Sequence, residues 1–190
     1  IFPQDKIKIL RDPVIESKKI NFLKKIPLDQ AYIANQDYYL AIGRLTNQKN
    51  FSFLINAFSE IIDQLLIKKL CIIGDGEQRN FLNELIIRKN LQKNIFLLNY
   101  QENPYNLIFN CKAVISTSFY EDPGFALIEA AYLNKLLISS NSKNGPKEMS
   151  LQNNIGMISI NLIHTEPGFI NNNYHVSMLH EVLNLSKQDE

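Results

Sequence analysis

The sequence predicts an α/β fold, a doubly wound parallel sheet, for most of its 190 residues. Two observations support this prediction. Short runs that are apolar throughout alternate with stretches of helical periodicity, and glycine or polar turn residues separate them. Strands that are apolar on both faces are buried on both faces, which is typical of a parallel sheet covered by helices on each side.

The first two strand–helix units are the most regular part of this pattern. Residues 38–43 (YYLAIG) form a short apolar run, and large apolar side chains recur at helical spacing over residues 50–66. The next predicted strand covers residues 69–73 (KLCII) and ends at the turn Gly74-Asp75-Gly76. A second helix is predicted at residues 78–91.

The second half of the chain repeats this order with shorter segments. Because each strand is again followed by a helix, parallel pairing is expected throughout. The predicted elements, in order, are a strand at 95–98, a helix near 105–111, a strand at 113–116, a helix at 124–133, strands at 135–139 and 156–160, and a helix near 176–185.

Residues 1–35 do not follow the alternation. Residues 6–10 are compatible with a strand, and Asp12-Pro13 would end it. A doubly wound domain does not need such a segment, so we expect the chain to begin inside something larger. We therefore assign residues 1–35 to an interdomain segment and residues 36–190 to the domain itself.

Composition and charge exclude several classes of function. A net charge of +1 gives no electrostatic case for binding nucleic acid. Cys71 and Cys111 lack a metal-binding spacing and are expected to be reduced core residues. No run reaches the roughly 18 apolar residues of a membrane span, and no signal peptide opens the chain, so we expect a cytoplasmic protein.

Two basic pairs are the local exception to this even charge. Lys18, Lys19, Lys24 and Lys25 flank residues 20–23. A solvated face is the interpretation that we favour. The alternative is contact with an anionic surface, which would place the protein peripherally at the inner face of the cytoplasmic membrane.

Candidate anion-binding residues follow the first predicted strand, at the sheet edge where ligands bind in open parallel sheets. Gly43 lets the backbone approach a ligand, Arg44 offers a bidentate fork, and Lys49 lies just before a helix begins. This arrangement suits a diphosphate, and two solvated surface cations are the alternative. Neither a P-loop nor a G-x-G-x-x-G fingerprint is present.

Two carboxylates frame the segment after the predicted strand at 113–116. Glu121 lies in the loop, Gly124 opens the following helix, and Glu129 lies inside that helix among apolar residues. A helix that is apolar on nearly all sides is expected to be buried, and a carboxylate there needs hydrogen-bond partners. The alternative for Glu129 is a structural ion pair with a neighbouring cation.

At these motifs the chain resembles glycosyltransferase family 4, of GT-B architecture, over roughly residues 6–160. Asp12-Pro13 stands where the family usually has Asn-Pro, and Ala126 replaces a usual glycine. The loop at residues 144–148 is similar to that of the branch that builds bacterial O-antigens and other surface glycans. The motifs that carry the resemblance are Gly43-Arg44-Leu45 followed by Lys49-Asn50, the turn Gly74-Asp75-Gly76, the pair Glu121 and Glu129, and Asn144-Gly145-Pro146-Lys147-Glu148.

The resemblance implies the C-terminal, donor-binding half of a retaining enzyme. Such an enzyme moves a hexose or N-acetylhexosamine from a nucleotide sugar, expected to be UDP-linked, to a glycan or lipid-linked acceptor. The roles that it implies are diphosphate binding for Arg44 and Lys49 beside Gly43, ribose binding for Glu129, the transferred sugar for Glu121, sugar and phosphate contacts for the backbone around Gly124, Phe125, Ala126 and Leu127, and the base for Tyr100 and Gln101.

No cofactor or metal ion is expected, because no D-x-D motif is present and the two cations would stabilise the leaving diphosphate in place of a metal. Acceptor recognition would belong to an N-terminal domain, so we expect no transfer by this chain alone. Two alternatives remain: another GT-B enzyme, such as a UDP-sugar epimerase or a sugar phosphorylase, and a non-catalytic nucleotide-binding module.

Overall fold

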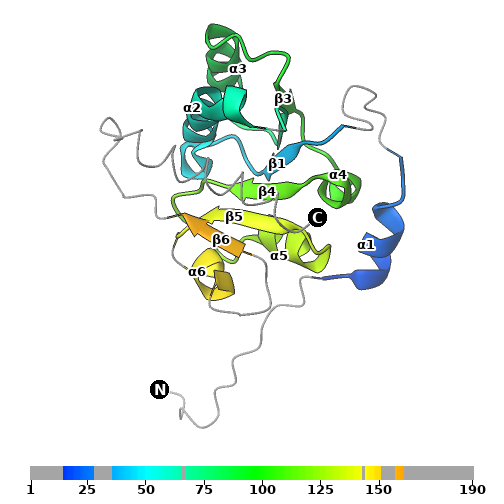
Figure 1. The fold of residues 1–190 in the computed structure, drawn as a ribbon. Helices are drawn as coiled ribbons and strands as arrows, with labels where there is room; N and C mark the ends of the chain where they lie inside the picture. Colours follow the sequence, from blue (N-terminus) through cyan, green and yellow to red (C-terminus); the bar gives the residue numbers. More distant parts are fainter. Residues whose placement is uncertain (1–14, 28–35, 66, 143, 151–156, 161–190) are drawn as a thin grey trace, which may run out of the picture.

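The computed structural model describes residues 15–27, 36–65, 67–142, 144–150 and 157–160. Its strands are β1 (Tyr39–Ile42), β2 (Leu70–Ile73), β3 (Ile95–Leu98), β4 (Ala113–Ser116), β5 (Leu136–Ser140) and β6 (Met157–Ile160). They form one six-stranded sheet in the order β3-β2-β1-β4-β5-β6, and every pairing is parallel (Figure 1). This is the strand order of Rossmann-type sheets, so the predicted fold class is confirmed.

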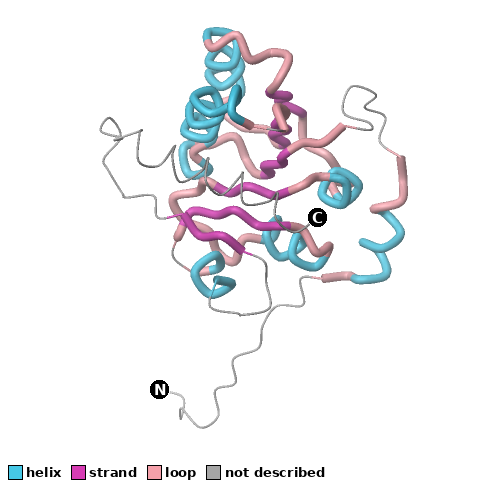
Figure 2. The backbone as a smooth tube through the Cα atoms, in the orientation of Figure 1, coloured by secondary structure: helices cyan, strands magenta, loops and turns pink. Residues whose placement is uncertain are grey.

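Helices alternate with these strands along the chain (Figure 2). The predicted strands agree with the observed ones to within one residue at either end, because fully apolar runs mark buried strands clearly. The helix predicted at 50–66 ends earlier and continues as a short 3-10 turn. The helical segments are α1 (Ser17–Leu23), η2 (Asn47–Lys49), α2 (Phe51–Ile61), η3 (Ile62–Gln64), α3 (Arg79–Arg88), α4 (Tyr105–Asn110), α5 (Phe125–Tyr132) and α6 (Gly145–Ser150).

The sheet separates two hydrophobic cores. Tyr39 and Ala41 of β1 pack in the core with α2 and α3, whereas Leu40, between them, packs in the other. That second core includes residues of α1, α4, α5 and α6. Successive strand residues point to opposite faces, so this alternation shows that helices cover both sides of the sheet. Each fully buried leucine or phenylalanine contributes about 1.5–3 kcal/mol.

Helix α1 was not predicted, and it packs against the body of the domain beside α4 (Figure 1). Ile20 is buried, and the Asn106 side-chain amide donates to the carbonyls of Lys24 and Ile26 at 3.0 and 2.7 Å. A helix of seven residues with one buried side chain has too little periodicity to be recognised. The strand at 6–10 and the helix near 176–185 lie outside the described residues.

The basic pairs of the sequence surround this helix. Lys18, Lys19 and Lys25 are exposed, and so is Phe22 on the same short segment. Exposure agrees with a solvated helix face and with membrane contact alike, so the choice between the two stays a prediction. No helix among the described residues has the length and apolarity needed to cross a membrane.

The segment predicted as a loop at residues 144–148 instead begins helix α6. Asn144 has a positive φ of 69° and forms a parallel bridge with Glu121. Gly145 follows, and a Cβ at that position would lie 1.8 Å from the carbonyl oxygen of Pro123. The start of α6 is therefore in close backbone contact with the loop that precedes α5.

The fold places one crevice at the centre of the sheet. β1 and β4 are neighbours, and the helices that follow them, α2 and α5, contribute to the cores on opposite faces. The loops after the two strands therefore diverge at their carboxyl ends. In open α/β sheets this reversal point is where ligands bind.

Candidate functional site

Two adjoining cavities of about 500 and 510 Å³ open at this crevice. The first is lined by the loops after β1 and β4 and by α5, and the second by the loops after β1, β2 and β3 and by the start of α4. Ile42, Gly43, Arg44 and Glu129 line both cavities. These four residues mark where the two compartments meet.

Every site residue predicted from the sequence lines at least one cavity. The geometry thus brings the predicted residues together, while their roles stay predictions. The first cavity holds Gly43, Arg44, Lys49, Glu121, Gly124, Phe125, Ala126, Leu127 and Glu129, and the second holds Gly43, Arg44, Tyr100, Gln101 and Glu129.

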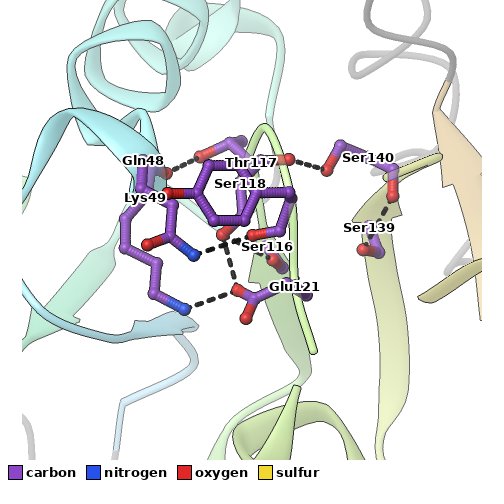
Figure 3. A network of polar contacts seen from close by, with 9 residues as sticks. Gln48, Lys49, Ser116, Thr117, Ser118, Glu121, Ser139 and Ser140 are labelled. Atoms are coloured by element: carbon purple, nitrogen blue, oxygen red, sulfur yellow. Dashed lines mark hydrogen bonds and ion pairs between the residues drawn. The ribbon is translucent and has the colours of Figure 1, made fainter. Parts of the chain in front are cut away.

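Lys49 and Glu121, predicted to contact different parts of a ligand, are paired with each other (Figure 3). The Lys49 Nζ atom lies 2.6 Å from Glu121 Oε1, and Ser118 Oγ donates to the same oxygen at 2.6 Å. The side chains of Lys49 and Glu121 are 16% and 11% exposed, so water screens the pair weakly. Charge-assisted bonds in such a setting hold the Glu121 carboxylate in one orientation.

Backbone contacts join the two loops that carry this pair. The amide of Phe119 donates to the Gln48 carbonyl at 2.9 Å, and the Gln48 side chain donates to the Tyr120 carbonyl at 2.9 Å. Thr117 Oγ1 donates to the Lys49 carbonyl at 3.0 Å (Figure 3). These bonds bring the segment after β1 against the segment after β4, so the two loops act as one unit.

Gly43 makes room for a side chain of the protein itself. A Cβ at this position would lie 2.9 Å from Lys49 Cε, so the lysine side chain occupies the space that the missing side chain leaves. The glycine therefore allows Lys49 to lie across the strand end toward Glu121. Whether a ligand also approaches this backbone stays a prediction.

The Arg44 side chain is exposed and makes no hydrogen bond or ion pair with any residue that the structure describes. The predicted turn at residues 74–76 packs against the loop after β1 that carries Arg44. The Leu45 amide donates to the Asp75 carbonyl at 2.8 Å, and a Cβ at Gly74, where φ is 156°, would lie 1.8 Å from the Gly43 carbonyl oxygen. Arg44 thus presents an uncompensated cation where the two cavities meet.

Glu129 lies in the middle of α5 and faces both cavities. Its Oε1 atom accepts a hydrogen bond from Tyr105 Oη at 2.9 Å, and within the described part of the chain it forms no ion pair. The predicted alternative, a structural ion pair, is therefore not what the described residues show. Burial raises the pKa of Glu129 above its usual range, and the Tyr105 hydrogen bond partly opposes this rise.

The expectation that α5 is buried on nearly all sides is wrong. Only Leu127 and Ala130 of this helix are buried, and Phe125 at its start is 52% exposed beside the first cavity. Gly124, with φ of 83°, precedes the helix in the left-handed region. The Leu127 amide donates to the Gly124 carbonyl at 3.0 Å, which leaves the amides of Phe125 and Ala126 as first-turn donors.

Together these groups offer three kinds of contact: a cation with first-turn helix amides for an anion, a half-buried carboxylate for hydroxyl groups, and aromatic side chains in the second cavity. Among the described residues, no three His, Cys, Asp or Glu side chains gather as a metal site. Ser118 and Tyr105 were missed from the sequence. The available signal was the position of Ser118 two residues after β4 and of Tyr105 at the start of a predicted helix.

Comparison with known proteins agrees with this arrangement. A family model described as glycosyl transferases group 1 matches residues 25–162. The uncharacterized glycosyltransferase MJ1059 of Methanocaldococcus jannaschii is 37% identical over 149 residues, which are 77% of this chain and 36% of that protein. The N-acetylgalactosamine-N,N'-diacetylbacillosaminyl-diphospho-undecaprenol 4-alpha-N-acetylgalactosaminyltransferase of Campylobacter jejuni is 29% identical over 121 residues, 64% of this chain and 32% of that protein.

A solved structure shows the same fold. The crystal structure of a Staphylococcus aureus TarM mutant in complex with fondaparinux, alpha-GlcNAc-glycerol and UDP matches with a TM-score of 0.66 at 26% identity, over 78% of this chain and 29% of that one. The chain thus spans about a third of the length of the curated relatives above. The parallel sheet and its helices have the fold found in GT-B glycosyltransferases, and with most of its length matched by the family model the chain belongs to the glycosyl transferases group 1 family.

Proposed function

We propose that this chain binds a nucleotide sugar, UDP-linked, as the donor-binding part of a retaining glycosyltransferase of family 4. One observation supports this most: two cavities of similar size meet at an exposed arginine and a half-buried carboxylate, Glu129. A nucleotide sugar has the matching layout, with a sugar at one end, a base at the other, and an anionic diphosphate and ribose between them.

The proposed placement follows the chemistry of each compartment. The diphosphate lies at Arg44 and the first-turn amides of α5, because an unpaired guanidinium and helix amides both favour an anion. The ribose hydroxyls donate to Glu129, and the base lies in the second cavity near Tyr100 and Gln101. The transferred sugar then lies in the first cavity, facing Glu121 and the exposed ring of Phe125.

The reaction that this placement supports is departure of a nucleoside diphosphate. Charge develops on the diphosphate as the glycosidic bond breaks, and preorganised cations and amides stabilise it. Arg44 is available for this directly. Lys49 is held by Glu121 at 2.6 Å, so we propose that it acts on both groups, neutralising the carboxylate and adding positive potential near the phosphate. We propose no metal ion and no cofactor in this step.

The names of similar proteins support the substrate class. The Campylobacter relative is named for transfer of N-acetylgalactosamine to a diphospho-undecaprenol-linked acceptor. The TarM structure contains UDP. We therefore propose a hexose or N-acetylhexosamine donor and a glycan or lipid-linked acceptor, with surface-glycan synthesis such as that of O-antigen as the setting.

Calorimetric titration of the 190-residue chain with UDP, GDP, ADP and uridine tests the proposal. We expect UDP to bind more tightly than the other three ligands, because base and diphosphate contacts both contribute. Equal affinity for all four ligands, or none, would contradict it. Incubation with UDP-sugars and lipid-linked acceptors tests the expectation that this chain alone transfers no sugar. No glycosylated product should form. A chain that binds UDP but transfers nothing even with its N-terminal part restored would be a non-catalytic nucleotide-binding module.

A further inference from the structure

Tyr105 and Glu129 meet in the second cavity from two separate strand–helix units. Tyr105 is the first residue of α4, and Glu129 lies within α5. The phenol Oη donates to Glu129 Oε1 at 2.9 Å, and both side chains line the cavity. The Tyr105 backbone is itself fixed, because its amide donates to Asn103 Oδ1 at 3.2 Å.

This contact uses only part of what the carboxylate can accept. A carboxylate has about four acceptor positions on its two oxygens. Within the described residues Tyr105 supplies the one hydrogen bond to the Glu129 carboxylate, and no cation pairs with it. Oε2 and part of Oε1 therefore keep their capacity to accept hydrogen bonds from a ligand in the cavity.

We propose that Tyr105 is a positioning residue for ribose recognition: its hydroxyl holds one oxygen of Glu129 and so directs the other toward the ribose hydroxyls of the donor. This inference rests on the proposed function. It adds a residue that neither the motifs nor the family match singled out. The hydroxyl limits rotation of the carboxylate before the ligand arrives, so less side-chain entropy is lost on binding.

The hydroxyl also maintains the charge that Glu129 needs to act as an acceptor. Burial raises the pKa of Glu129, and the hydrogen bond from Tyr105 lowers it. The pKa of Tyr105 is raised to about 12, so the phenol remains a donor near neutral pH. Glu129 lines both cavities, and the other charged or titratable side chains there are Arg44, Asp75, Tyr100 and Glu102 in the second and Arg44, Lys49, Glu121 and Asp122 in the first.

Tyr105→Phe tests the proposal through two measurements, ribose discrimination and pH dependence. The ratio of the affinities for UDP and for 2′,3′-dideoxy-UDP measures recognition of the ribose hydroxyls. We expect a ratio of about tenfold or more in the native chain, and a fall of at least about threefold in this ratio in Tyr105→Phe. On acidification, Tyr105→Phe should also lose UDP binding at a higher pH than the native chain does, because Glu129 without its hydrogen-bond donor protonates more readily.

Tyr132→Phe is the matched control. Tyr132 also lies on α5, and its hydroxyl accepts a hydrogen bond from Asn21 at 3.0 Å, outside both cavities. Removing this hydroxyl deletes a hydrogen bond between two elements of the fold without touching Glu129. The discrimination ratio and the pH midpoint of UDP binding should both remain at their native values.

A double-mutant cycle separates positioning from a structural role. In a Glu129→Gln background the carboxylate is absent, so adding Tyr105→Phe should leave the pH profile unchanged. The positioning role alone fails under one combination of results. In that case the native chain binds UDP, Glu129→Ala loses this binding, and Tyr105→Phe has the native discrimination ratio and the native pH midpoint. Absence of UDP binding in the native chain would overturn the proposed function and this inference together.

Discussion

Glu121 and Glu129 lie at the same edge of the sheet but are held in opposite ways. A lysine and a serine both lie 2.6 Å from one oxygen of Glu121, whereas the Glu129 carboxylate has one partner among the described residues, the neutral Tyr105 hydroxyl at 2.9 Å. The first carboxylate is compensated within the protein and helps to join two loops. The second keeps acceptor capacity and carries the cost of burial. The difference shows that the hydrogen bonds and charge of Glu121 are largely satisfied within the protein, while Glu129 keeps the acceptor positions that a ligand takes up in the proposed function.

The largest expected effect comes from breaking the compensated pair. Lys49→Ala leaves the Glu121 carboxylate, 11% exposed, without its cation. Removing one partner of a buried pair is strongly destabilising, so we expect a loss of about 3 kcal/mol in the free energy of unfolding. Urea denaturation at neutral pH measures it.

Two further variants complete that test. Lys19→Ala removes a cation whose pair with Glu16 is long, at 4.0 Å, and largely exposed, and it should change stability by less than about 0.5 kcal/mol. The double variant Lys49→Met with Glu121→Gln removes both charges and should recover most of the loss. If Lys49→Ala lowers the free energy of unfolding no more than Lys19→Ala does, the pair of Lys49 and Glu121 does not stabilise the fold and the comparison fails.

Glu129→Ala should affect ligand binding far more than stability. Charge-assisted hydrogen bonds contribute about 1.5–3 kcal/mol, so UDP affinity should fall roughly tenfold or more. The free energy of unfolding should change less than in Lys49→Ala, because the burial cost of the carboxylate disappears with it. Calorimetry and urea denaturation on the same variant compare the two effects. Undiminished UDP affinity in the folded variant would assign Glu129 to structure alone.

Arg44→Ala extends the comparison to the two cations. The Arg44 side chain is exposed and has no hydrogen-bond or ion-pair partner among the described residues, so its removal should leave the free energy of unfolding nearly unchanged. UDP affinity should fall severalfold while uridine affinity is retained, because the guanidinium contacts phosphate. Added salt should weaken UDP binding and spare uridine. An equal loss for both ligands would show that Arg44 is not at the diphosphate.

The smallest expected effect is a pH-dependent gain in stability for Glu129→Gln. Burial raises the pKa of Glu129 in the folded protein, so the cost of holding the carboxylate ionised is absent below the unfolded pKa, grows as pH rises toward the folded-state pKa, and is fully present above it. The variant keeps an acceptor for Tyr105 and avoids this cost. Its Tm should exceed the native value at pH 7, and the difference should vanish below the unfolded pKa of about 4.3. A difference that does not depend on pH would contradict the assignment.

The sequence predicted the sheet well because its strands are buried on both faces. Leu70 to Ile73 is apolar throughout, and such runs leave little choice of element. The site residues were found because parallel strands bring their carboxyl ends to one edge. The helices α1 and α6, of seven and six residues, are too short to give a comparable periodicity and were missed.

Pairing between side chains was the part that the sequence could not show. Lys49 and Glu121 come from loops far apart in the chain, and either could have faced a ligand instead. The apolar sequence around Glu129 suggested a fully buried helix, but Phe125 is exposed and α5 buries one face only. The hydrophobicity of a segment shows which residues can be buried. Which residues of α5 are buried depends on its packing against β4 and β5.

The strand order also has a consequence for how the site assembles during folding. Tyr39 pairs with Leu70 on one side of β1 and with Ala113 on the other, and the latter is the pairing that spans the most chain in this sheet. Contacts between distant parts of a chain cost the most loop entropy and form slowly. The half-sheet β1-β2-β3 and the half-sheet β4-β5-β6 can each gain structure locally, but neither holds both Arg44 and Glu129. A ligand that contacts both Arg44 and Glu129 therefore binds only when the two half-sheets have joined. Such a ligand should protect the pairing of β1 with β4 most strongly against opening.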